Sequence, residues 1–158
     1  MATDPSALDA TDRALLSALR DNGRASWAEL ARLIGLTAPS VQERARRLEE
    51  RGVIAGYTAV VQPAATGLGV TALVGVALGE GADQQDVTLR LRDLPEIEDC
   101  YLVAGEDSFL AKVRVADIPA LERSLSRLQG IRGVARTRTT VVLSTPWEHR
   151  TPPAPEPA

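Results

Sequence analysis

The sequence contains very little cysteine, histidine or aromatic side chain. Its 158 residues include one cysteine, Cys100, and one histidine, His149, which excludes disulfide scaffolds and zinc sites of the Cys/His type. Aromatic residues make up only 3% of the chain, too few for an RNA-binding sheet that stacks bases. No apolar run reaches the ~20 residues of a membrane span, and the start lacks a basic, apolar signal segment. We therefore expect a cytoplasmic protein with no membrane partner, no metal and no cofactor.

An excess of positive charge is also missing. The net charge is −3, which taken alone argues against a nucleic-acid partner. The distribution is more informative, because residues 1–57 hold eight arginines against eight acidic residues. Four of these arginines (Arg44, Arg46, Arg47 and Arg51) fall within eight positions. The charge pattern therefore permits DNA binding without requiring it.

Three helices are predicted in the first 52 residues. The first runs from about Asp9 to Asn22, with Asp9 as its cap and an apolar face of leucines. The second begins at the capping box Ser26-Trp27-Ala28-Glu29, and the third begins at Thr37 and ends at Arg51-Gly52. The side chains expected to be buried are Leu15, Leu16 and Leu19, then Leu30, Ala31, Leu33 and Ile34, then Val41, Ala45 and Leu48.

The second and third helices have the spacing of a helix-turn-helix. Ala31 permits close helix packing, Gly35 suits the turn, and Val41 anchors the second helix of the motif. The third helix would then enter the major groove, where Arg and Gln contact base edges and hydroxyls contact phosphates. A bundle of three amphipathic helices, used for protein interaction, is the alternative. The candidate DNA-binding residues are Ser26, Thr37, Ser40, Gln42, Glu43, Arg44, Arg46 and Arg47.

The rest of the chain alternates between strand and helix patterns. β structure is expected at Val53–Ile54 and Tyr57–Val61, before a connector. One strand–helix–strand unit then occurs twice, which predicts an α+β fold with a four-stranded antiparallel sheet and two helices on one face. The elements are Val70–Leu78, Gln84–Leu94, Ile97–Val103, Ser108–Val115, Ile118–Leu128 and Val134–Leu143.

These patterns divide the chain into four segments. The helix-turn-helix domain spans 1–60, a linker 61–69, and the βαββαβ domain 70–145. The last segment, 146–158, contains five prolines and is predicted to be disordered. Cys100 is expected to be a small buried apolar residue rather than a redox sensor. Glu106 and Asp107 are expected to lie in a solvated turn rather than form a catalytic pair.

Several motifs in order resemble the Lrp/AsnC (leucine-responsive, feast/famine) transcriptional regulators. The resemblance covers about residues 8–143 and implies a prokaryotic DNA-binding regulator. It implies a winged helix-turn-helix followed by a ferredoxin-like effector-binding and oligomerisation (RAM) domain. It also implies homodimers that assemble further, often to octamers, and an amino-acid effector bound between dimers. The motifs are Leu8-Asp9-Ala10-Thr11-Asp12, Asn22-Gly23-Arg24-Ala25-Ser26, Gly35-Leu36-Thr37, Arg47-Leu48-Glu49, Gly52-Val53-Ile54-Ala55-Gly56-Tyr57, Asp99 to Gly105, and Thr137-Arg138-Thr139.

The same resemblance implies the position of an effector pocket. The family uses a Gly-acid-x-Asp turn and a Thr-x-Thr segment of the last strand. This chain has Ser108 where the second Asp is usual, with Asp107 one position earlier. Because a hydroxyl cannot pair with an ammonium group as a carboxylate does, both an amino-acid effector and a ligand-free regulator stay open. The implied pocket residues are Tyr101, Val103, Gly105, Glu106, Asp107, Ser108, Thr137 and Thr139.

Two other functions are compatible with this resemblance. Siroheme decarboxylases are enzymes that resemble the same fold, but they would be expected to need histidine or other polar residues facing a tetrapyrrole. This chain has no histidine before His149, so we expect no enzyme and no catalytic residue. The other alternative is an architectural protein that compacts DNA with little sequence preference and no ligand.

Overall fold

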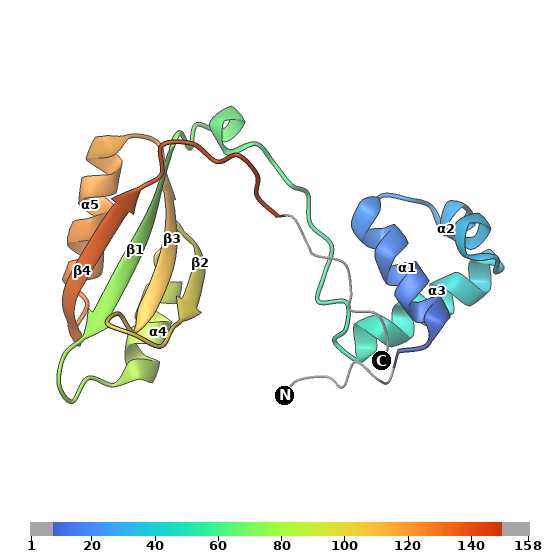
Figure 1. Ribbon diagram of the computed structural model, residues 1–158, viewed down its shortest axis with the longest axis horizontal. Helices are drawn as coiled ribbons and strands as arrows, with labels where there is room; N and C mark the ends of the chain where they lie inside the picture. Colours follow the sequence, from blue (N-terminus) through green and yellow to red (C-terminus); the bar gives the residue numbers. More distant parts are fainter. Residues whose placement is uncertain (1–7, 150–158) are drawn as a thin grey trace. The chain divides into compact units, whose positions relative to one another are not determined.

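Each helix of the N-terminal unit begins at a side-chain cap. The structure, a computed structural model, describes residues 8–149, and its chain divides into two units between Val60 and Val61 (Figure 1). Asp9 and Ser26 each form a capping box, whereas Thr37 accepts a hydrogen bond from the backbone N–H of Ser40. The three helices are α1 (Ala10–Asp21), α2 (Trp27–Ile34) and α3 (Ala38–Glu50).

The core of this unit contains the predicted apolar faces with one exception. Leu15, Leu30 and Val41 are fully buried where the helices meet. The expectation that Leu33 is buried is wrong, because its side chain is 72% exposed. At 3.6 residues per turn, Leu33 lies about 160° around α2 from Ala31, on the side away from the core.

The β structure expected after α3 is absent from the described residues 53–61. Val53 and Ile54 pack against the helical core instead, and the Tyr57 hydroxyl donates a 2.8 Å hydrogen bond to Glu49 Oε1. Residues 55–61 have no regular secondary structure and are exposed. A segment with no neighbouring strand cannot form the hydrogen-bonded ladder of a sheet, so its apolar pattern alone is not enough for the β wing of a winged helix-turn-helix.

The second unit is the predicted βαββαβ fold, which the structure confirms. A short 3-10 turn, η2 (Pro63–Thr66), precedes the sheet. The strands are antiparallel in the order β2-β3-β1-β4, so β2 and β4 form the two edges. The elements are β1 (Val70–Leu78), α4 (Gln84–Arg92), β2 (Ile97–Leu102), β3 (Phe109–Val115), α5 (Ile118–Gln129) and β4 (Val134–Val141).

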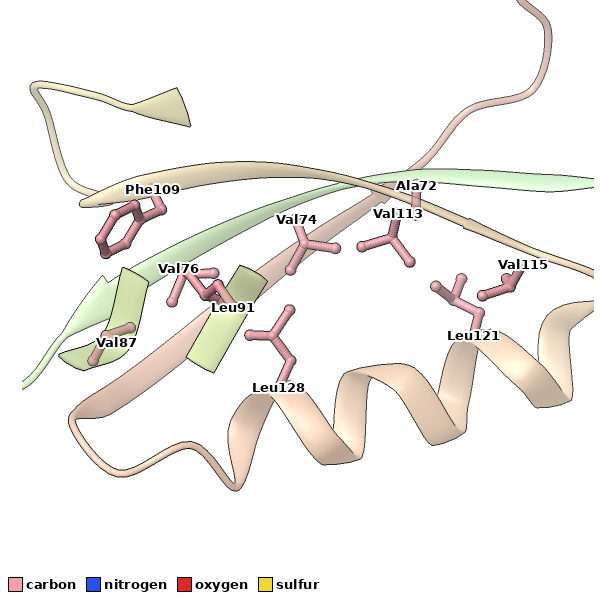
Figure 2. Packing of buried hydrophobic residues seen from close by; sticks show 10 residues of the cluster. All are labelled: Ala72, Val74, Val76, Val87, Leu91, Phe109, Val113, Val115, Leu121 and Leu128. Atoms are coloured by element: carbon pink, nitrogen blue, oxygen red, sulfur yellow. The ribbon is translucent and has the colours of Figure 1, made fainter. Parts of the chain in front are cut away.

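The two helices of this unit cover one face of the sheet. Figure 2 shows Val74 and Val113 pointing from the strands toward Leu121 and Leu128 of α5. Alternate residues of the same strands, such as Leu73, project from the opposite face, here called the open face. Among the described residues no helix or strand packs on the open face. The fold therefore leaves one side of a four-stranded sheet available.

Cys100 is exposed, which corrects the expectation of a buried residue. It lies on edge strand β2, where the short helix α4 leaves a groove of about 480 Å³ rather than covering the strand. Partial burial raises the pKa of the Cys100 thiol, which disfavours the reactive thiolate.

The segment after β4 was expected to be disordered from residue 146. The structure describes Pro146 to His149, and residues 150–158 of that expectation lie outside the described range. Within the described part, Glu148 contacts the sheet, as set out below. Among the described residues, no helix has the length and apolar character needed to span a bilayer.

Candidate nucleic-acid interface and effector site

The turn between α2 and α3 has the geometry that a helix-turn-helix requires. Ala31 is 5% exposed at the point where the two helices meet, and Val41 is fully buried. Gly35 ends α2 with φ 71° and ψ 32°, in the left-handed region that side chains avoid. These three residues therefore occupy the positions predicted for them.

The exposed side of α3 brings most of the candidate DNA-binding residues together. Ser40, Glu43 and Arg47 follow the helical repeat along one stripe that faces away from the buried stripe. Gln42 is also exposed, about 100° around α3 from Glu43. At the N-terminus of α3, the hydroxyls of Thr37 and Ser40 lie 2.9 Å apart. Ser26 is placed apart from this set, because its hydroxyl belongs to the capping box of α2.

The three arginines of α3 differ in how they are engaged. Arg46 is bound to Glu43 at 2.6 Å and also to Glu50, and these carboxylates raise its guanidinium pKa. Arg47 is the most available, with a side chain 57% exposed and only a 4.0 Å approach to Glu43. Exposed ion pairs of this kind contribute little and exchange readily, so Arg46 and Arg47 both remain able to meet a phosphate or a base.

Arg44 is placed differently. Its Nη1 donates to Asp9 Oδ2 at 2.6 Å and to Asp12 Oδ1 at 2.8 Å, so the guanidinium faces α1 rather than solvent. Hydrogen bonds from the Asp12 backbone N–H and from Arg44 lower the pKa of Asp9. No spacing in the sequence indicates these contacts, because the partners are more than 30 residues apart.

In the second unit, the side chain of Asp107 is largely covered, which corrects the expectation of a solvated turn. Its side chain is 10% exposed, and its Oδ2 accepts a 2.6 Å hydrogen bond from Arg138 Nη2 on β4. The carboxylate lies directly over Gly75 of β1, where a Cβ atom would stand 2.7 Å from Cγ. The Asp107 Oδ1 is buried and accepts no hydrogen bond from any described residue. Glu106, by contrast, is well exposed and approaches Arg138 at 3.3 Å.

The remainder of the β2–β3 turn is fixed by the strands beside it. The backbone N–H of Ser108 donates to the carbonyl of Val76 at 2.8 Å, and the Leu78 N–H donates to the Ser108 hydroxyl at 3.4 Å. Val103 and Ser108 are joined by a 3.0 Å backbone hydrogen bond. Gly105 at the tip has φ 148°. Ser108 therefore supports the sheet, and within this turn it is Asp107 that places a carboxylate over the open face.

Tyr101, Thr137 and Thr139 are not brought together within one chain. Tyr101 pairs with Leu110 on the open face of edge strand β2. Thr137 and Thr139 pair with Val76 and Val74, so they lie on the helix-covered face of β4. The two edges are three strand spacings apart, roughly 14 Å. A single sheet cannot close a pocket around all three.

A cluster of charge on the open face was missed in the sequence. Lys112 and Arg114 of β3 are about nine-tenths buried there. Glu98 binds both, at 3.0 Å and 2.6 Å, and Glu148 from beyond β4 also binds both, at 2.7 Å to Arg114. Because Lys112 and Arg114 are two positions apart on one strand, the sequence indicates only that they share a face. The contribution of Glu148 depends on the path of the chain after the sheet.

Comparison with known proteins supports both halves of this description. The profile of the AsnC-type helix-turn-helix domain matches residues 8–49, and that of the Lrp/AsnC ligand binding domain matches residues 71–152. The HTH-type transcriptional regulator LrpA of Mycobacterium tuberculosis is 43% identical over 144 residues, covering 91% of this chain and 95% of that protein. The leucine-responsive regulatory protein of Escherichia coli is 37% identical, covering 86% and 85%.

Solved structures give the same likeness in three dimensions. The feast or famine regulatory protein of M. tuberculosis, complexed with L-methionine, superposes with a TM-score of 0.89. It is 42% identical and covers 94% of this chain and all of that one. AsnC of E. coli superposes with a TM-score of 0.83 at 30% identity, covering 91% of this chain and 97% of that one.

Proposed function

The chain belongs to the Lrp/AsnC family of transcriptional regulators, and from that premise we propose how it meets DNA and its effector. The N-terminal half of α3 enters the major groove, with Ser40, Gln42 and Arg47 directed at base edges. Thr37, Ser26 and Arg46 face phosphates on either side. The observation that carries this assignment is the exposed stripe of α3, which presents Arg47 beside polar groups at the helix N-terminus.

Glu43 holds a different place in the proposal. It binds Arg46 at 2.6 Å and has its pKa lowered chiefly by that hydrogen bond. A carboxylate on a DNA-facing stripe repels phosphate but accepts from the amino group of cytosine. Glu43 therefore favours particular bases and disfavours general attraction. This point supports a sequence-specific regulator over an architectural DNA-compacting protein.

Two copies are proposed to associate through the open faces of their sheets. Leu73 and Tyr101 expose apolar surface there, and no described helix or strand covers that face of the sheet. Two-fold symmetry would present two copies of α3 to successive major grooves of a pseudo-palindromic site. Further association of dimers, up to an octamer, would bend the DNA between sites.

The proposed effector is an amino acid bound where dimers meet. The L-methionine complex of the M. tuberculosis relative supports this class of ligand. Because Tyr101 lies on β2 and Thr137 and Thr139 lie on β4, the pocket would take its walls from more than one copy. Val103 and the turn from Gly105 to Ser108 would line its mouth. No catalytic role is proposed, and the relatives are named as regulators. The proposed location is the cytoplasm, at the nucleoid.

The first test is fluorescence anisotropy of the full chain on DNA from upstream of its own gene. The same measurement on scrambled DNA, over a salt series, separates specific from general binding. Tight, salt-sensitive binding that favours the upstream DNA is expected. Equal affinity for both DNAs would support the compaction alternative. Repeating the titration with L-methionine and then other amino acids tests the effector, and assembly is read by light scattering.

Arg47→Ala is the sharpest variant for the position of α3. Loss of one bidentate base contact should weaken binding to the upstream DNA by about 1–3 kcal/mol and relax specificity at one base pair. Arg123→Ala on α5 is the matched control, since it removes an exposed arginine from the other unit. Unchanged affinity in Arg47→Ala would remove α3's exposed stripe from the interface.

A further inference from the structure

Arg44 is the arginine of α3 that the exposed stripe does not explain. Its side chain is 25% exposed, against 57% for Arg47 and 53% for Arg46. Both of its ion-pair partners belong to α1, so its contacts link two helices rather than neighbouring turns of one. The exposed pairs of Arg46 join residues three or four positions apart on α3 itself.

The contacts of Arg44 complete the capping box of α1. Asp9 Oδ1 accepts from the Asp12 N–H at 2.6 Å, and Asp12 Oδ2 accepts from the Asp9 N–H at 3.4 Å. Each carboxylate therefore uses one oxygen to cap the helix and gives its other oxygen to Arg44 Nη1. One guanidinium nitrogen thus fixes both acids of the box, and the box fixes the position of that guanidinium.

Moving Arg44 onto DNA would leave these acids without their cation. Asp12 is largely buried, with a side chain 12% exposed, so its charge would be poorly solvated. Asp9 would be left as a negative charge beside the DNA-facing helix. Both effects oppose a direct contact between Arg44 and a base or phosphate.

We propose that Arg44 is a positioning residue, which ties the N-terminus of α1 to α3 and so fixes the angle at which α3 meets DNA. This rests on the proposed function of α3 as the DNA-reading helix. Arg44 acts through Asp9 and Asp12, and its loss changes the orientation of α3 while removing no contact to the nucleic acid.

Substitution of Asp9 and Asp12 should change the affinity for DNA in opposite directions for the two possible roles of Arg44, positioning and direct contact. Asp9→Asn with Asp12→Asn keeps good capping groups, because Asn caps helices about as well as Asp. The double variant raises the net charge by two, which by itself strengthens DNA binding. If Arg44 positions α3, affinity for the upstream DNA falls about tenfold in spite of the added charge. If Arg44 contacts DNA directly, affinity stays equal or rises.

The full experiment is a double-mutant cycle on the complete chain. Anisotropy is measured for wild type, Arg44→Ala, the double Asn variant and their combination, with Arg47→Ala as the direct-contact comparison. The combination should bind no worse than Arg44→Ala, since both changes break one link. The salt slope should stay near that of wild type in Arg44→Ala. In Arg46→Ala, measured alongside because Arg46 is proposed to face a phosphate, the slope should fall by about 1. Independent, multiplying losses or a slope reduced in Arg44→Ala would overturn the proposal.

Thermal unfolding by circular dichroism separates this proposal from the one on which it rests. All variants should retain the helical signal. Arg44→Ala and the double Asn variant should each lower the melting temperature, and their combination should lower it by less than the sum of the two shifts. If the wild-type chain bound no DNA, the proposed function would fail on its own. The melting cycle would then decide the link, with additive shifts overturning it and non-additive shifts supporting it.

Discussion

At the scale of single residues, the second unit is organised around one close approach. Gly75 lies in the middle strand pair of the sheet, and the Asp107 carboxylate occupies the space where its side chain would be. Arg138 from β4 binds that carboxylate at 2.6 Å, so three strands and a turn meet at this point. The absence of one Cβ atom therefore permits the turn to fold onto the open face.

Gly75→Ala should destabilise the chain by about 1–3 kcal/mol, because the added methyl group overlaps Asp107 and cannot be accommodated without moving the turn. Urea unfolding followed by circular dichroism measures this. Gly79→Ala is the matched control, since its Cβ would have nearest neighbours at 3.7 Å, an ordinary contact. Equal stability of the two variants would mean that Asp107 has another position available at no cost.

At the scale of elements, most features that were predicted correctly depend on local sequence. Caps such as Asp9 and Ser26 and the alternation of β1 act over a few residues, and the observed elements begin and end close to the predicted positions. The predictions that Leu33 is buried and that β structure follows α3 were wrong, because burial and strand pairing depend on neighbours distant in sequence. The exposed stripe of α3 follows from its helical period. The Arg44 link and the burial of Asp107 are long-range contacts that no spacing reveals.

The turn between α2 and α3 gives a prediction at the same scale. Gly35→Ala should lower stability by about 1–2 kcal/mol, because an L side chain is strained at φ 71°. Affinity for DNA should fall with it, since the angle between α2 and α3 depends on this residue. Gly35→Asn is the control, because Asn tolerates the left-handed region better. Melting temperature and anisotropy should move together in both variants. A stable Ala variant with wild-type binding would contradict the role given to the turn.

At the scale of the whole chain, the segment after β4 is held on the sheet by charge. Glu148 pairs with Lys112 and with Arg114, whose side chains are buried among the strands. Hydrogen bonds from Lys112 and then from Arg114 outweigh burial and lower the pKa of Glu148 below 4.5. A carboxylate with a lowered pKa stabilises this contact above pH 4.5 and loses that contribution as the pH falls through the lowered value.

Release of this segment in acid should be visible at Trp147, which is exposed next to Glu148. In a Trp27→Phe background, the steady-state anisotropy of Trp147 fluorescence should fall below pH 4.5 as the segment gains motion. The same background with Glu148→Gln should already show low anisotropy at pH 7. Circular dichroism at each pH separates release from unfolding. An anisotropy that is equal in both proteins at pH 7 would contradict the contact.

The separation of Tyr101 and Thr139 on opposite edges of the sheet has a genetic consequence. Suppose that one copy supplies the β2 wall of an effector pocket and another copy supplies the β4 wall. A substitution in one wall and a substitution in the other, carried by different chains, then need not inactivate the same pocket. Chains with Tyr101→Ala and chains with Thr139→Ala would each fail to respond alone. Expressed in the same cell, they would form mixed assemblies in which some junctions join two intact walls. Two alleles that are each unresponsive would then complement one another.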